Sequence, residues 1–186
     1  IRAVMAIPCV TGDWRHVGGG AVCMTSGHHP LAEDAVVYPP DIPRLRTRAI
    51  NMSRLAEALT VLDDPPVRAL VVFDANPAAT VPDSRRVRAG LLRDDLFTVV
   101  LEQRRTDTVA YADVVLPATM QPEHLDLHPA YGHHYTTLNE PAVAPPGQCL
   151  PNTEIFRRLA RALGLEHPSL YQSDEEIVAA LLDDDT

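Results

Sequence analysis

The sequence predicts an α/β protein, Rossmann-like in type, with a mostly parallel sheet and helices on both faces in three layers. Two near-continuous apolar runs rich in β-branched residues, 67–73 and 96–101, are typical of strands buried on both faces. A polar helical segment, 83–92, lies between them, and a third short strand, 114–116, ends at Pro117. Strands that alternate with helices over short links indicate parallel pairing with right-handed crossovers.

We expect one structural unit with two parts. Residues 67–186 would form the α/β domain that holds a nucleotide cofactor, and residues 1–66 a loop-rich segment that packs on it. Three consecutive glycines at 18–20 indicate a tight turn or a close backbone approach in the N-terminal part. At the other end, apolar periodicity predicts a helix over 152–163, and Ser173 opens a last amphipathic helix.

Composition excludes several classes of function. The net charge is −9, with 25 acidic residues against 16 basic ones, so non-specific nucleic-acid binding is not expected. No apolar run is long enough to insert in a membrane. Cys9, Cys23 and Cys149 are far apart, which disfavours an iron–sulfur or zinc site made by this chain alone. Their odd number suits a reducing compartment, and we expect the cytoplasm, with export of the parent protein left open.

Two polar residues follow buried strands. Asn76 comes just after the first strand, and in open parallel sheets ligands bind beyond the carboxyl ends of the strands. Its amide can donate and accept hydrogen bonds, although a turn residue is the simpler reading. Glu102 ends the second strand, where an acid often accepts hydrogen bonds from a ribose or a guanine edge; a solvated charge is the alternative. A Gly-x-Gly-x-x-Gly fingerprint is missing, which disfavours a conventional NAD site.

The histidines suggest a weaker possibility. His124 and His128 are four residues apart with Asp126 between them, a spacing that suits metal ligation on a helix. Pro122 and Pro129 bracket the stretch and make a long helix improbable. We therefore favour contacts with a partner domain over a metal site. The serine nucleophile elbow Gly-x-Ser-x-Gly is also absent, which leaves hydrolase chemistry as a residual alternative.

Five segments, taken together, carry a family resemblance. They are FDANPAATVP (73–82), DLFTVVLE (95–102), TDTVAYADVVLPAT (106–119), YGHHYTTLNEP (131–141) and PNTEIFRRLA (151–160). In this order and spacing they resemble the molybdopterin oxidoreductases of the dimethyl sulfoxide reductase family. The segment TGDWRHVGGG (11–20) fits a region that lies earlier in those enzymes, so the resemblance covers nearly the whole chain.

The resemblance implies a cofactor-binding domain of the formate dehydrogenase and dimethyl sulfoxide reductase type. Such a domain holds one guanine dinucleotide arm of bis(molybdopterin guanine dinucleotide), bis-MGD, in the large subunit. The parent enzyme would carry out two-electron redox chemistry or oxygen-atom transfer. By motif match, Asn76 would contact the cofactor and Glu102 would lie beside the nucleoside.

Two further positions follow from the same resemblance, each with two candidates. Glu123 or His124 lies where some members place a cofactor-facing polar residue. Asn152 or Glu154 falls where others have a guanine-facing acid or amide.

The sequence also departs from the family pattern. Neither the N-terminal cysteine cluster for an iron–sulfur centre nor the Cys, selenocysteine or Ser ligand of molybdenum can be placed in it, and the domain that embraces the second arm is absent. We expect a large-subunit fragment that is inactive alone, has no catalytic or metal-binding residue, and holds no cofactor in isolation. Its partners would be the remaining domains, including the iron–sulfur and molybdenum-ligand regions, with self-association through exposed apolar surface possible. The alternative is a free-standing nucleotide-binding or interaction module without redox activity.

Overall fold

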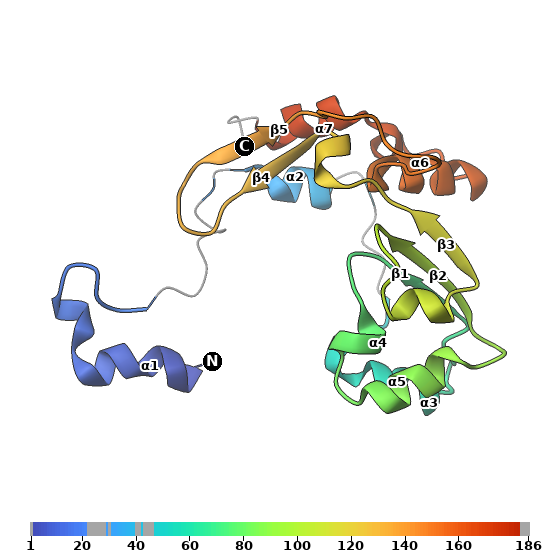
Figure 1. The fold of residues 1–186 in the computed structure, drawn as a ribbon, viewed down its shortest axis with the longest axis horizontal. Coiled ribbons are helices and arrows are strands. Elements are labelled where there is room, and N and C mark those ends of the chain that lie inside the picture. Colours follow the sequence, from blue (N-terminus) through green and yellow to red (C-terminus); the bar gives the residue numbers. More distant parts are fainter. Residues whose placement is uncertain (1, 22–28, 30, 40–41, 43–46, 183–186) are drawn as a thin grey trace.

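A three-stranded parallel sheet organises the central part of the chain (Figure 1). The computed structural model describes residues 2–21, 29, 31–39, 42 and 47–182. The strands run in the order β1-β2-β3, with Val99 of the middle strand opposite Val71 and Val114. Their bounds are β1 (Ala69–Val72), β2 (Phe97–Glu102) and β3 (Val114–Pro117). The predicted α/β class with parallel pairing is confirmed; the three-layer arrangement stays a prediction.

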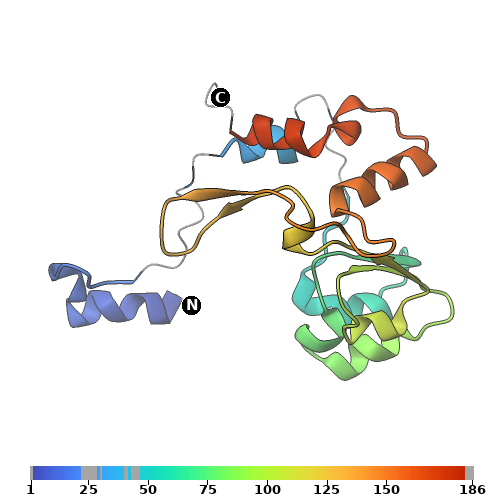
Figure 2. The ribbon, with the colours of Figure 1, turned by 45° about the horizontal axis from the view of Figure 1, so that its top comes forward.

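Three helices gather on one side of this sheet in both views (Figures 1 and 2). They are α3 (Leu55–Thr60), α4 (Pro77–Thr80) and α5 (Ser84–Leu91). The carboxylate of Asp83 accepts a hydrogen bond from the Arg86 backbone amide and so begins α5. Leu59, Val87 and Leu96 form the centre of the core that these helices share with the sheet. Packing of the buried face of α5 against this core therefore fixes the position of the segment that joins β1 to β2.

A second, smaller core lies around the end of the middle strand. Leu101 and Ala118 pack there with Ile155 of α6 (Asn152–Ala162). Leu150 joins them through an isolated parallel bridge to Ala118, with its amide donating to the carbonyl of Pro117 at 3.1 Å. These contacts bring the first turn of α6 to the carboxyl ends of the strands.

The edge strands differ from the sequence expectation. Residues 67–73 were expected to be buried on both faces, yet the Val71 and Phe73 side chains are 52% and 47% exposed. The reason is that α3, α4 and α5 lie on one side of the sheet, whereas alternate side chains point to the other side, where Phe97 of the middle strand is also 52% exposed. Val100, in the middle strand, is fully buried as expected.

An antiparallel pair and two helices make up a separate part of the fold. β4 (Asp126–Pro129) pairs with β5 (Thr136–Asn139), and α2 (Glu33–Val37) lies beside α7 (Asp174–Leu181) (Figure 2). Ser173 begins α7 as expected, because its hydroxyl accepts a hydrogen bond from the Glu176 amide. The 3₁₀ turns are η1 (Asp13–Arg15), η3 (Met52–Arg54), η4 (Thr108–Tyr111), η5 (Gln121–Glu123) and η6 (Pro168–Tyr171).

The N-terminal helix α1 (Arg2–Thr11) lies apart from the sheet in both views (Figures 1 and 2). Gly20 follows it with a φ of 106°, and a Cβ there would sit 2.8 Å from the Trp14 ring, so the glycine permits a close backbone approach. The division of the chain at residue 66 stays a prediction. In the part of the chain that is described, no helix is long and apolar enough to cross a membrane.

Candidate functional site

A cleft of about 610 Å³ opens where β1 and β2 end. Residues just after β1, at the end of β2, and at the start of α6 line it, together with part of the segment before β4. Carboxyl ends of parallel strands are the usual place for a ligand in an open α/β sheet. The position of the cleft therefore follows from the parallel topology.

Asn76 lies in the turn between the end of β1 and the start of α4, and it lines the cleft. Its side-chain Oδ1 accepts two hydrogen bonds from Thr108, one from the backbone amide at 3.2 Å and one from the hydroxyl at 2.7 Å. No described residue bonds the Nδ2 group. Pro77 at the first position of α4 needs no hydrogen-bond acceptor there, so the chain can turn sharply after Asn76.

Glu102 closes β2 on the neighbouring strand and lines the same cleft. Its Oε1 accepts a hydrogen bond from the Gln103 amide at 2.8 Å, and its Oε2 accepts one from the Thr106 hydroxyl at 3.1 Å. A carboxylate has about four acceptor positions, so it can still accept hydrogen bonds from a ligand. Gln103 is anchored through its Nε2, which donates to the Thr119 carbonyl at 2.7 Å.

His124 and Asn152 reach the cleft from other segments. His124 Nδ1 lies 2.9 Å from the Thr119 hydroxyl, and its Nε2 lies 3.7 Å from Asp126 Oδ2. Asn152 is the first residue of α6, and its Oδ1 is buried without a hydrogen-bond partner among the described residues. A buried amide oxygen without a partner is costly unless a ligand or water satisfies it. The structure thus brings these two side chains together with Asn76 and Glu102.

Glu123 and Glu154 do not line the cleft. Glu123 accepts a hydrogen bond from the Met120 amide at 2.9 Å and so stabilises η5. Glu154 accepts one from Arg158 Nε at 2.9 Å, which with the charges of Arg158, Arg161 and Arg157 holds the pKa of this carboxyl below its ordinary value. Within each predicted pair, His124 and Asn152 are therefore the members at the cleft.

The histidine pair does not form a metal centre in the described part of the chain. The stretch is extended rather than helical, because β4 begins at Asp126. His124 Nε2 and His128 Nε2 lie 3.7 and 3.6 Å from the same Asp126 oxygen. Among the described residues, no group of three or more His, Cys, Asp and Glu side chains could hold a metal ion. Cys23 lies outside the described residues.

Several cleft residues were not predicted. Asp74 follows β1 with a φ of 50°, a left-handed conformation that Asp tolerates better than most residues. Asp74 lies two residues before Asn76, and Gln103 directly follows Glu102. Both are polar residues at a strand end, and this pattern in the sequence would have identified them. Gln121 and Asp126 reach the cleft only through the tertiary path of the chain, which no local pattern records.

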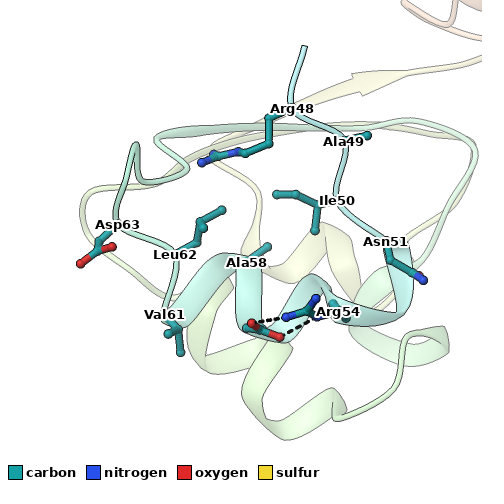
Figure 3. A pocket seen from close by; sticks show the side chains of 10 residues that line it. Arg48, Ala49, Ile50, Asn51, Arg54, Ala58, Val61, Leu62 and Asp63 are labelled. Atoms are coloured by element: carbon teal, nitrogen blue, oxygen red, sulfur yellow. Dashed lines mark hydrogen bonds and ion pairs between the residues drawn. The ribbon is translucent and has the colours of Figure 1, made fainter. Parts of the chain in front are cut away.

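A second hollow, of about 400 Å³, lies between the segment before η3 and α3 (Figure 3). Two arginines border it, but both are engaged. Arg48 donates to the carbonyls of Asp64 and Pro65 at 3.0 and 2.9 Å, and Arg54 Nε donates to Glu57 Oε2 at 2.8 Å. This hollow is away from the strand ends and offers fewer free polar groups than the cleft.

Comparison with known proteins decides the family. Residues 18–162 match the family model described as "Molybdopterin oxidoreductase". The chain belongs to the molybdopterin oxidoreductase family. This confirms the resemblance carried by the sequence segments, and the family's cofactor is molybdopterin.

The relatives within this family are much longer. The chain is 42% identical over 98% of its length to "Probable oxidoreductase YoaE" of Bacillus subtilis, and covers 27% of it. It is 29% identical over 91% of its length to a nitrate reductase of Symbiobacterium thermophilum, and covers 23% of it. The chain thus spans about a quarter of the length of these curated relatives.

A solved structure shows the same fold. Acetylene hydratase from Pelobacter acetylenicus superposes with a TM-score of 0.61 at 24% identity, over 71% of this chain and 18% of that chain. Identity at this level supports the shared fold only.

The charges of the cleft decide which part of a molybdopterin cofactor its residues fit. Asp74, Glu102 and Asp126 supply carboxylates, whereas no arginine lines the cleft among the described residues. Carboxylates accept hydrogen bonds from hydroxyl and N–H groups and repel phosphates. The cleft therefore fits the parts of a cofactor that carry hydroxyl and N–H groups better than it fits a phosphate.

Proposed function

We propose that this chain is the cofactor-binding part of a molybdopterin-dependent oxidoreductase, and that its cleft holds the nucleoside end of one guanine dinucleotide arm of bis-MGD. The observation that carries the proposal is the convergence of Asn76 and Glu102 at the ends of adjacent strands, one with a free donor and one with free acceptor positions. A nucleoside carries hydrogen-bond acceptors and donors within one rigid unit, so it can bond to Asn76 and Glu102 at the same time.

Each cleft residue has a distinct role in this proposal. Asn76 donates through Nδ2 to a carbonyl or ether oxygen, and Glu102 accepts from ribose hydroxyls or a base N–H. Asn152 accepts through its partnerless Oδ1, which gives that buried atom the hydrogen bond it lacks. The ring of Phe73, half exposed at the rim of the cleft, offers an apolar surface to a planar base.

The pyrophosphate would lie on the α6 side of the cleft, where backbone amides at the start of the helix offer hydrogen-bond donors. The first intrahelical bond of this helix is donated by Ile155 to the Pro151 carbonyl, so the preceding amides are available to an anion. These residues would bind and orient the arm. When bound in the parent enzyme, the molybdenum centre supplies the two-electron redox or oxygen-atom transfer chemistry.

The remaining enzyme would come from outside these residues. Molybdenum ligands, any iron–sulfur centre and the site for the second arm would belong to other domains, and this chain alone would be inactive. Exposed apolar side chains on α6, Phe156 and Leu159, support a packing surface for such domains or for a second copy. We propose a cytoplasmic location, which the odd number of cysteines supports.

Calorimetric titration of the 186-residue chain with GDP, GMP and NAD tests the proposal. GDP and GMP should bind more tightly than NAD, and Glu102→Gln should weaken both by about tenfold because a hydrogen bond to a charged acceptor becomes a neutral one. Glu175→Gln, an exposed position on α7, is the matched control and should leave binding unchanged. Tighter binding of NAD than of the guanine nucleotides would overturn the proposal and favour a free-standing nucleotide-binding module.

A further inference from the structure

We propose that Thr106 and Thr108 are positioning residues of the cleft: Thr108 fixes the amide of Asn76 so that it can only donate to the ligand, and Thr106 holds the orientation of the Glu102 carboxylate, which accepts from the ligand. Thr106 lies in the short turn that follows β2, and Thr108 is the first residue of η4. The selection of a ligand by the cleft rests on the proposed function. The orientation of Asn76 and Glu102 by the threonines rests only on contacts within the chain.

The first step is a chain of hydrogen bonds with a fixed direction. The Ala78 amide donates to the Thr108 hydroxyl oxygen at 3.1 Å, so the Thr108 hydroxyl hydrogen is free to point at Asn76 Oδ1, 2.7 Å away. The Thr108 amide donates to the same Oδ1 at 3.2 Å. A backbone amide can only donate, so the Asn76 atom that faces it must be the oxygen.

Burial makes this orientation difficult to reverse. The Thr108 side chain is 0% exposed, and no water can take over its bonds without displacing the core. Turning the Asn76 amide over would set its NH₂ group against the Thr108 amide and leave a buried donor without an acceptor, which is costly. Asn76 therefore presents Nδ2 and its two hydrogens to the cleft.

The same turn holds the second residue. The Thr106 hydroxyl donates to Glu102 Oε2 at 3.1 Å, while the Thr106 carbonyl accepts from the Val109 amide at 3.2 Å. The segment that contains Thr106 and Thr108 therefore forms hydrogen bonds within itself, to Glu102 at the end of β2, and to Asn76 beyond the end of β1. An ionised carboxylate only accepts hydrogen bonds, so the Thr106 bond sets the direction in which Glu102 offers its remaining acceptor positions to a ligand.

This polarity defines the class of ligand. An acceptor atom, such as a carbonyl, ether or phosphate oxygen, must face Asn76, and a hydroxyl or N–H donor must face Glu102. Ligands that offer an acceptor to Glu102 or a donor to Asn76 are excluded at those two points. At Asn76 the selection is made by Thr108, which need not touch the ligand.

NMR of the side-chain amide of Asn76, assigned by its loss in Asn76→Asp, tests the positioning in the absence of ligand. Thr108→Val, which keeps the shape and removes the hydroxyl, should move and broaden this signal. Thr108→Ser, which restores a hydroxyl, should return it close to its original position. An Asn76 signal that is the same in Thr108→Val and in the unaltered chain would overturn the inference.

The unaltered chain offers a measurement that does not depend on the folding of a variant. The Thr108 hydroxyl proton should exchange slowly enough to be observed and should give a nuclear Overhauser effect to the Ala78 amide proton. A hydroxyl proton that exchanges too fast to observe would contradict the hydrogen-bond chain.

Titration with GDP separates this inference from the proposed function. Thr108→Val should bind GDP about tenfold more weakly, and Thr108→Ser within about twofold of the unaltered chain. Normal GDP binding by a folded Thr108→Val variant would overturn the positioning role and leave the proposed function intact. Failure of the unaltered chain to bind GDP, with the NMR effects present, would overturn the proposed function and support the positioning role.

Discussion

The side-chain carbonyl of Asn76 and the hydroxyl of Thr108 lie 2.7 Å apart, although the two residues are 32 positions apart in the sequence. This bond ties the end of β1 to the turn that follows β2. A residue at the cleft is therefore held by one that is buried below it.

Asn76→Asp should weaken GDP binding by at least about tenfold, because it replaces a donor by an acceptor and adds negative charge to an acidic cleft. The new carboxylate can still accept both bonds from Thr108, so the melting temperature should change little. Asn51→Asp is the control, because Asn51 caps η3 through its side-chain oxygen and Asp caps equally well. Calorimetry and thermal unfolding measure the two effects. Undiminished GDP binding by Asn76→Asp would contradict the assigned contact.

The affinity for GDP should stay level or rise as salt is increased, whereas the affinity for guanosine should not respond. The reason is that carboxylates at Asp74, Glu102 and Asp126 repel the phosphates and salt screens this repulsion. Titrations at low and at about 150 mM ionic strength measure it. A steep loss of GDP affinity with salt would instead indicate a phosphate site built from arginines.

Glu154 should contribute stability that is lost in acid. Its pKa is lowered in the folded chain, chiefly by the hydrogen bond from Arg158. A carboxyl with a lowered folded pKa stabilises the fold above its unfolded pKa, and that contribution is lost as the pH falls through the folded value. Melting temperatures measured between about pH 6 and pH 3 should therefore fall less steeply for Glu154→Gln than for the unaltered chain. Identical slopes would show that the arginine cluster does not stabilise the fold.

Gly90→Ala should destabilise the chain by about 1–3 kcal/mol, although alanine favours helices. A Cβ at Gly90 would lie 2.5 Å from Leu59 Cβ, so α3 and α5 would be pushed apart. Ala89→Ser, at the exposed neighbouring position, should stay within about 0.5 kcal/mol. Urea unfolding measures both. A Gly90→Ala variant as stable as the unaltered chain would show that the two helices can separate without cost.

Local patterns predicted most of the central fold. The apolar run that became β2 and the Ser173 cap of α7 required no knowledge of distant contacts. Asn76 and Glu102 could be predicted to line the cleft because the end of a parallel strand is a position that sequence order alone defines; their contact with a cofactor stays a prediction.

The remaining features depend on contacts between distant segments. The exposure of Val71 depends on which face of the sheet the helices cover, and the choice between Asn152 and Glu154 depends on arginines that bind the glutamate. The α-helix at Arg2–Thr11 was not assigned, because the apolar stretch at residues 1–7 is too short to assign from its pattern. Thr108 could not be recognised, because its partner is fixed only when β1 and β2 pair.

The most direct test of the central claim is to locate bound GDP on the 186-residue chain by amide chemical-shift perturbation. The cleft predicts that the largest changes fall on Asp74–Asn76, on Glu102 and Gln103, and on the Asn152 amide at the start of α6. The hollow in Figure 3 supplies the internal comparison, since Arg48, Ile50 and Arg54 should barely respond. Changes centred on those residues, with the strand-end residues unmoved, would contradict the account.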